Sequence, residues 1–176
     1  MSTGEPLDAQ QVVRLFNQEF AESDTTELIG GAAEPYYEPG SLNRIYFRAD
    51  YVRSALHEVA HWCVAGRRRR RLPDYGYWYS PDGRDAAQQQ AFFAVEARPQ
   101  AIERCFCEAI GIPFSPSVDN VGAQIEPQQL RRFEARIEEW CNQFERTGLP
   151  PRAARFITAL RSTTSLSRDP VPECAA

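Results

Sequence analysis

The only two histidines of this 176-residue chain, His57 and His61, stand four positions apart in the segment ALHEVAH. On an α-helix, residues four apart lie on one face with Cβ atoms about 5–6 Å apart, close enough for both imidazoles to bind one ion. Apolar periodicity predicts such a helix between an N-cap at Asp50 and an end at Gly66. Its apolar face comprises Val52, Leu56, Val59, Ala60 and Cys63. Because the histidines border this face, the sequence predicts a metal-binding helix at the edge of the core.

The remaining pattern predicts an α+β fold, a single compact domain with several helices around a small sheet. Helical periodicity is present over residues 12–20, after Pro127 and around Phe156, while RIYF at residues 44–47 and YGYWYS at residues 75–80 are typical of strands. Two helical stretches meet at Pro99, whose missing N–H predicts a kink or break just after Glu96. The domain is expected to span residues 1–161, followed by a polar, flexible tail at residues 162–176.

Composition narrows the class of protein. The first residues lack a charged start followed by an apolar run, and no apolar stretch approaches the length of a bilayer span, so a soluble, cytoplasmic protein without a membrane partner is expected. The five cysteines are an odd number without CxxC spacing, which favours reduced thiols over a disulfide framework. A net charge of −4 gives no global case for nucleic-acid binding.

A catalytic metal generally has three protein ligands and one open position. Because no other histidine is present, the third ligand is expected to be a carboxylate or a thiol. Glu96 is the leading candidate, since it lies on another predicted helix just before the interruption at Pro99. Asp82 and Asp85, next to the predicted turn SPDG, are the alternatives, while Cys63 faces the apolar side of its own helix.

Two histidines and a glutamate do not by themselves decide the chemistry. The same ligands serve zinc hydrolases of the thermolysin type and the facial triad of non-heme iron oxygenases. In a zinc peptidase, Glu58 of the HExxH motif would be the catalytic base that activates water, whereas in an oxygenase it would have a supporting role. A metal-dependent nuclease, with the run RRRRR at residues 67–71 as a phosphate site, and a noncatalytic binding module are further alternatives.

Five longer stretches of the chain match one known family in the same order: NRIYF, SALHEVAHWCVAG, DYGYWYSPDGRDAAQQQ, VEARPQAIERCFCEAIGIPF and SVDN. The chain resembles the bacterial elongation factor P hydroxylase family in these stretches, and the similarity extends from LFNQEF to ARFITAL. Members of that family hydroxylate the β-lysylated lysine of elongation factor P. The resemblance implies metal ligation by His57, His61 and Glu96, and a fold close to that of small metal-dependent hydrolases. The run at residues 67–71 is more basic than the family pattern.

The resemblance also implies the cofactors and the substrate. Fe(II) and dioxygen are the expected reactants, with zinc or another divalent metal as an alternative in the purified protein, and nothing in the sequence identifies a 2-oxoglutarate site. A β-lysylated lysine of elongation factor P needs apolar walls for its methylenes and a carboxylate or an aromatic face for its ammonium groups. The candidates for these contacts, beside the predicted aromatic strand, are Tyr77, Tyr79, Asp82 and Asp119.

Overall fold

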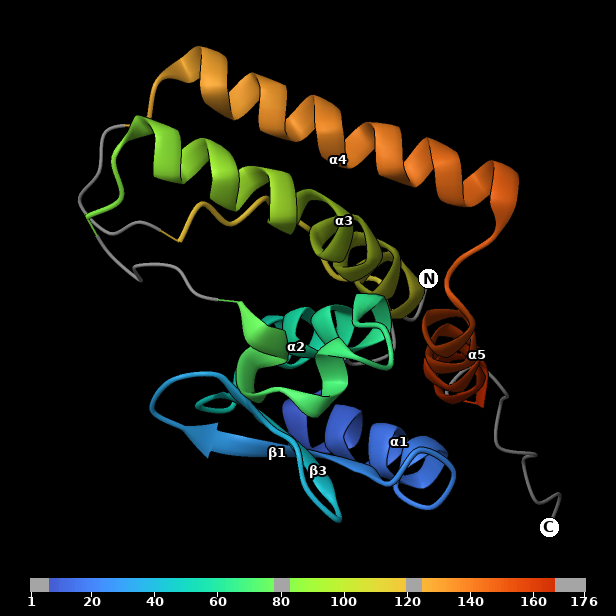
Figure 1. Ribbon diagram of the computed structural model, residues 1–176. Coiled ribbons are helices and arrows are strands. Elements are labelled where there is room, and N and C mark those ends of the chain that lie inside the picture. The colour runs from blue at the N-terminus through green and yellow to red at the C-terminus, as the bar shows by residue number, and fades with distance from the viewer. Residues whose placement is uncertain (1–6, 78–82, 120–124, 167–176) are drawn as a thin grey trace, which may run out of the picture.

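The structure, a computed structural model, describes residues 7–77, 83–119 and 125–166 of the chain. Within these ranges, five α-helices and a three-stranded mixed sheet confirm the predicted α+β class (Figure 1). The strands are β1 (Thr26–Ala32), β2 (Tyr36–Glu38) and β3 (Asn43–Arg48). The helices are α1 (Ala9–Phe20), α2 (Val52–Val64), α3 (Ala86–Ile110), α4 (Pro127–Thr147) and α5 (Pro151–Leu166). Two 3-10 turns, Arg69–Arg71 and Pro73–Gly76, follow α2.

The sheet has β3 at its centre, with β1 parallel and β2 antiparallel to it. Leu28 of β1 and Tyr37 of β2 both align with Ile45 of β3, and all three side chains are buried. Gly30 lies over the ring of Phe47, where an added Cβ would stand 2.7 Å from the ring carbon Cζ. This close approach explains a glycine inside a strand, where glycine is otherwise unfavourable.

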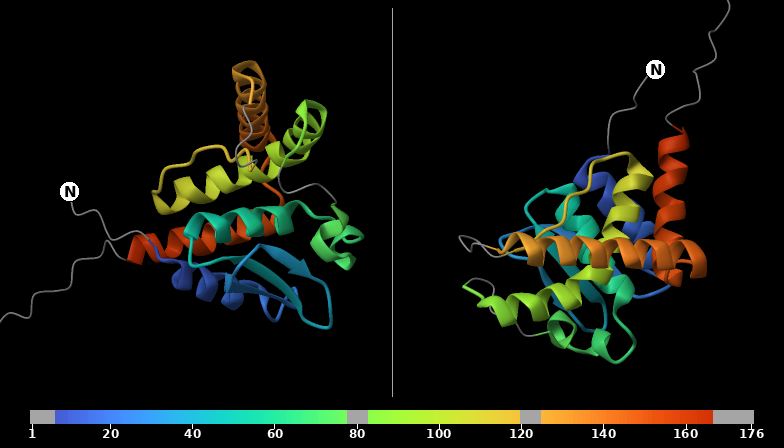
Figure 2. Two further views of the ribbon diagram at one scale, coloured as in Figure 1. Left: turned by 90° about the vertical axis from the view of Figure 1, so that its left-hand side faces the viewer. Right: turned by 90° about the horizontal axis from the view of Figure 1, so that it is seen from above.

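The helices form layers above the sheet, and α2 lies between the sheet and α3 (Figures 1 and 2). On the inner side of α2, Trp62 contacts Phe20 of α1 with ring centroids 4.9 Å apart, and Phe16 contacts Phe156 of α5 at 5.7 Å. These aromatic side chains are among the most completely buried of the described residues. Because one side of α2 is buried in this cluster, another side is available to face α3.

Two local predictions near α2 are wrong. The helix begins at Val52 with Tyr51 as its N-cap, and the predicted cap, Asp50, is one residue too early. The predicted strand at residues 75–80 is not formed at its start, because Asp74 and Tyr75 have φ values of +46° and +58° inside a 3-10 turn. The Tyr75 ring stacks on that of Tyr37 at 4.2 Å, so aromatic burial rather than alternation decides its position. Residues 78–80 lie outside the described residues.

Of the kink or break predicted just after Glu96, no break forms, because α3 continues through Pro99 as one helix. Figure 2 shows the helix changing direction near its middle, as expected where a proline removes one backbone hydrogen bond. Phe93 before the proline and Phe106 after it are both buried, so packing holds the two halves together. At the other end of the chain, α5 extends to Leu166, past residue 162, where the tail was predicted to begin.

Candidate metal centre

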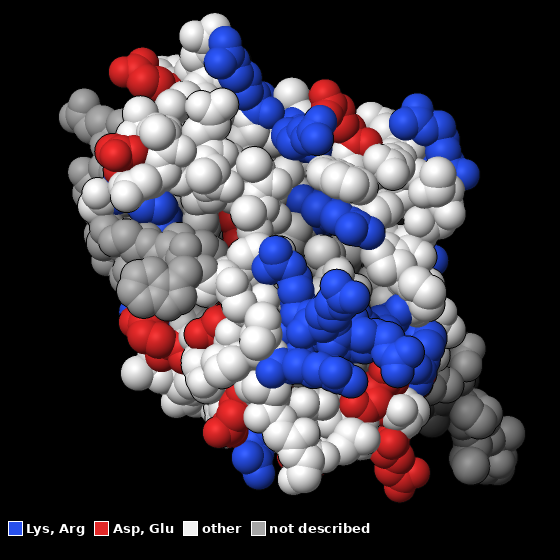
Figure 3. Space-filling model, viewed as in Figure 1, with Lys and Arg blue, Asp and Glu red and all other residues white. Residues whose placement is uncertain are grey.

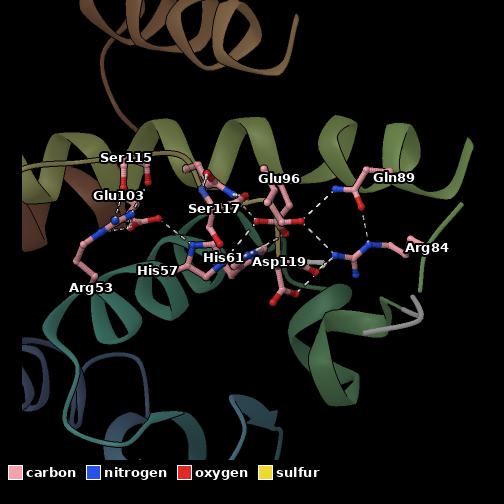
Figure 4. Close-up of polar contacts among 12 residues, drawn as sticks. Arg53, His57, His61, Arg84, Gln89, Glu96, Glu103, Ser115, Ser117 and Asp119 are labelled. Atoms are coloured by element: carbon pink, nitrogen blue, oxygen red, sulfur yellow. Dashed lines mark hydrogen bonds and ion pairs between the residues drawn. The ribbon is translucent and has the colours of Figure 1, made fainter. Parts of the chain in front are cut away.

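His57 and His61 project from α2 toward α3 (Figure 4). Their Nε2 atoms are 3.1 Å apart, and their ring centroids are separated by 4.7 Å. The His61 side chain is buried, whereas that of His57 is 23% exposed. One imidazole is therefore enclosed by the protein, while the other can be reached from solvent.

Glu96 meets the two histidines from the facing side of α3. Its Oε1 atom lies 3.2 Å from His61 Nε2, and its Oε2 atom lies 3.5 Å from His57 Nε2. One ligand atom from each of the three residues falls within 4.8 Å of the others. The structure thus brings together the three residues selected from the sequence as possible metal ligands.

Glu103, about two turns further along α3 than Glu96, orients His57. Its Oε2 atom lies 2.9 Å from His57 Nδ1, while its Oε1 atom accepts hydrogen bonds from Arg53 Nε and Nη2 at 3.1 and 2.7 Å. A carboxylate at Nδ1 requires the proton to be on that nitrogen, and the lone pair of a neutral ring is then on Nε2. Glu103 therefore directs Nε2 of His57, the nitrogen that could bind a metal, toward Glu96.

The charges of the centre shift the pKa values of its members in opposite directions. Burial lowers the pKa of His57, but the hydrogen bond and charge of Glu103, with the charge of Glu96, outweigh burial and raise this pKa to about 10. Burial raises the pKa of Glu96, but the nearby histidines hold it at about 2. Without a metal the centre therefore keeps a proton on His57 at neutral pH, and a metal ion would compete with that proton.

The residues present fit a divalent transition metal. Glu96 Oε1 is buried and has no hydrogen-bond partner among the described residues, because His61 Nε2 is near it without hydrogen-bond geometry. An unpaired buried carboxylate oxygen is costly, and a cation would satisfy it. Two imidazole nitrogens and one carboxylate form a donor set suited to zinc and to Fe(II).

Two side chains link the centre to the segment that follows α3, residues 112–119, called here the 112–119 connection. Gln100 donates to Glu96 Oε2 at 3.3 Å and to the Ser117 carbonyl at 2.9 Å, and its Oε1 accepts from the Ser117 N–H at 2.9 Å. Arg53 donates to the hydroxyl and the carbonyl of Ser115 at 2.9 and 2.7 Å. The connection is thus fixed to both helices that carry the centre.

Glu58 lies beside the ligand group rather than within it. It is half-buried, and burial raises its pKa, while the charges of His57 and His61 lower it. The carboxyl group is therefore close enough to the histidines to interact with them electrostatically. This position suits either a base for water or a supporting charge.

The other residues selected from the sequence are distributed around the centre. Cys63 is buried in the core, as predicted, and is not in the ligand group. Tyr77 is partly buried, with the Arg69 guanidinium 4.2 Å above its ring. Asp119 ends the 112–119 connection with an exposed side chain. Two further candidates, Tyr79 and Asp82, lie outside the described residues.

Three polar residues of the centre were not predicted from the sequence: Arg53, Gln100 and Glu103. A signal was present, because Arg53 precedes His57 by one helical turn, and Gln100 and Glu103 follow Glu96 at i+4 and i+7. Polar side chains at helical spacing within an otherwise apolar face indicate a buried polar network. The spacing does not indicate which of them contact a metal.

Asp85, the alternative third ligand, caps α3. Its side chain accepts from the Gln88 N–H at 2.8 Å, and the Gln88 side chain accepts from the Asp85 N–H at 2.9 Å. Asp85→Ala is therefore expected to lower the free energy of unfolding by about 1 kcal/mol, as measured by urea denaturation, without changing metal affinity. Asp85→Asn, whose side chain can still cap the helix, should leave the free energy of unfolding nearly unchanged. Metal loss in Asp85→Ala at unchanged stability would contradict this assignment.

A centre of two histidines and one glutamate on facing helices, in a small α+β domain, defines a candidate metalloenzyme. The family model described as elongation factor P hydroxylase matches residues 15–169 of the chain. The elongation factor P lysine hydroxylase of Haemophilus influenzae is 39% identical over 164 residues, which cover 91% of this chain and 91% of that protein. The chain belongs to the elongation factor P hydroxylase family, as its sequence motifs suggested. None of the helices in the described residues has the length and apolar character of a membrane span.

Proposed function

We propose that this protein hydroxylates elongation factor P on its β-lysylated lysine, with Fe(II) held by His57, His61 and Glu96. The observation that carries the proposal is the convergence of these three side chains, with ligand atoms within 4.8 Å, in a member of this family. The name of the Haemophilus influenzae relative, which specifies a lysine of elongation factor P, supports the substrate. Because elongation factor P acts in translation, the place of action is the cytoplasm.

The protein's own groups prepare this centre. Glu103 holds a proton on His57 Nδ1 and so leaves Nε2 to bind the metal, while Gln100 positions the Glu96 carboxylate through Oε2. Bound Fe(II) would supply the activation of dioxygen that oxidation of an unactivated C–H bond requires. The partial exposure of His57 gives the substrate side chain a direction of approach.

The ammonium groups of the modified lysine need aromatic or anionic partners beside the centre. Among the described residues, we assign this role to Tyr77 and Asp119. The Asp119 backbone has a φ of +39°, and its carbonyl accepts a hydrogen bond from the buried Arg84 side chain. Its side chain is 63% exposed, and its Oδ2 atom lies 3.9 Å from Arg84 Nη2. Tyr79 and Asp82 belong to the same proposed set.

The reaction is tested by incubating the Fe(II)-loaded protein with a reductant, dioxygen and β-lysylated elongation factor P. Mass spectrometry of the modified peptide is expected to show one added oxygen atom, and labelled dioxygen should deliver its label to the product. The unmodified factor should be a poorer substrate, because it lacks the β-lysyl extension. A folded, iron-loaded protein that leaves the factor unchanged with every reductant, while hydrolysing peptides or RNA, would refute the proposal.

Replacement of Glu58 by glutamine separates the hydroxylase from a zinc peptidase. A peptidase would lose nearly all turnover, because the base that activates water is removed. In the proposed hydroxylase dioxygen replaces water as the reactant, so we expect a loss of less than about tenfold in kcat, below the 10²–10⁴ typical of a lost general base. The measurement is turnover of the factor and of general peptide substrates by both proteins. Peptide hydrolysis that is lost in Glu58→Gln would favour the peptidase.

A further inference from the structure

Arginines gather on one face of the molecule, over the segment that follows α2 (Figure 3). The basic patch is defined here as residues 67–71 together with Arg98. All of its residues except Arg70 and Arg98, which are half-buried, are exposed. Within the described residues, none of these six arginines forms an ion pair with a carboxylate. Because the chain has a net charge of −4, this concentration of positive charge opposes the charge of the whole protein.

The basic patch borders a groove with a volume of about 620 Å³. Val64, Gly66 and Tyr77 line the groove together with Arg98 and the arginines at 67–69. The Arg69 guanidinium is held over the Tyr77 ring at 4.2 Å, and its Nη1 atom donates to the Tyr75 carbonyl at 3.2 Å. Arg98 lines the groove with its guanidinium 5.0 Å from the centroid of the Trp140 ring. The groove therefore combines apolar walls with cationic donors.

The groove is lined by residues of both helices that carry the candidate metal centre, Val64 of α2 and Arg98 of α3. Val64 follows His61 by three residues in α2, and Arg98 follows Glu96 by two residues in α3. Each of these separations is less than about 5 Å along the helix axis, and Arg98 points to another side of α3 than Glu96. A protein whose lysine enters the centre would therefore place the surface around that lysine over the groove and the basic patch.

We propose that the basic patch binds carboxylates on the surface of the protein substrate that flank its modified lysine. This inference rests on the proposed function. A β-lysylated lysine carries two ammonium groups, which the basic patch would repel unless neighbouring residues of the substrate were acidic. Arginine side chains bind carboxylates through paired N–H groups, and such complementary charges speed encounter and set the orientation of the partner.

The observations favour an acidic protein surface over a nucleic acid. Figure 3 shows acidic side chains at the margins of the basic patch, and the overall charge is negative. An extended polyanion would pass from the basic patch onto this acidic surface, whereas a compact group of carboxylates would not. A groove of about 620 Å³ has the size of a site for a few side chains.

The test reverses three exposed charges together, in the variant Arg67→Glu/Arg68→Glu/Arg71→Glu. Arg69 is left in place because it contacts Tyr75 and Tyr77. The matched control, Arg14→Glu/Arg131→Glu/Arg132→Glu, reverses three exposed arginines of α1 and α4 and has the same net charge. Hydroxylation of β-lysylated elongation factor P is measured as KM and kcat at low and high salt, and metal uptake is measured for every variant.

We expect the patch variant to raise KM about tenfold at low salt with kcat nearly unchanged, because charges at the edge of an interface mainly affect association. The difference in KM between the patch variant and the wild type should become smaller at high salt. The control variant should have the KM of the wild type. Should the patch variant misfold, Arg67→Gln/Arg68→Gln/Arg71→Gln provides the same comparison with a smaller rise in KM.

Equal KM values for the patch and control variants, with active wild-type protein, would overturn the docking inference alone. Loss of binding to a labelled single-stranded RNA, with KM unchanged, would overturn it in favour of a nucleic-acid site. If the metal-loaded wild-type protein does not modify the factor at all, the proposed function fails and the docking inference fails with it.

Discussion

Glu96→Ala is expected to abolish high-affinity metal binding and hydroxylation together. Glu96 supplies the only carboxylate of the three-residue ligand group in the described part of the chain, and its side chain is buried between two helices. Removing a direct ligand should weaken metal binding by more than about 100-fold, the upper end of the loss caused by removing an outer partner. Metal affinity is measured by titration against a competing chelator under anaerobic conditions.

The control for this variant is Glu134→Ala, which removes an exposed glutamate from α4 and should leave metal affinity unchanged. A stability measurement gives an independent readout. Metal at 100 times its Kd should stabilise the wild-type protein by about 2.7 kcal/mol and the Glu96→Ala protein hardly at all. If Glu96→Ala keeps its metal and its activity, the third ligand is another residue, and Asp82 becomes the next one to replace.

Replacement of Glu103 is expected to weaken metal binding by about 10- to 100-fold, although this residue does not belong to the ligand group. Glu103→Leu removes the acceptor for His57 Nδ1 and should be at the upper end of that range. Glu103→Gln keeps a neutral acceptor at the same position and should be near the lower end. The same chelator titration checks both variants.

The comparison with Arg53→Met isolates the role of the His57 contact. That variant removes the arginine from Glu103 but leaves the carboxylate beside Nδ1, so its effect on metal affinity should be smaller than that of Glu103→Leu. Metal affinity in Glu103→Leu equal to that of the wild type would show that His57 does not need a carboxylate partner.

Much of the candidate metal centre could be predicted from the sequence, because the signals for it lie within short segments of the chain. The spacing of His57 and His61 places both side chains on one face as soon as the segment is helical. The apolar periodicity of the segment predicts that helix. Glu96 was selected by its place on a second helix and by the resemblance of VEARPQ to the family motif. The α+β class followed in the same way from separate helical and strand patterns.

The errors arise where tertiary contacts outweigh local preference. Pro99 predicts a kink or break, and buried phenylalanines on both sides exclude the break by holding α3 together as one helix. The alternating aromatic residues after residue 74 predict a strand, but stacking of Tyr75 on Tyr37 requires a turn with positive φ values. No strand was predicted at β1, because Gly30 and Gly31 are weak strand formers and the reason for Gly30, the Phe47 ring, lies on another strand.

The 112–119 connection changes what is expected of insertions and deletions in this protein. Surface segments between helices usually vary in length with little effect on the rest of a protein. Here Arg53 and Gln100 hold Ser115 and Ser117 with the same side chains that hold the carboxylates of the centre. One added or deleted residue between these two serines is expected to shift the register of these contacts and to disturb the candidate metal ligands from outside. The length of this surface segment is therefore restricted by its contacts to the candidate metal centre.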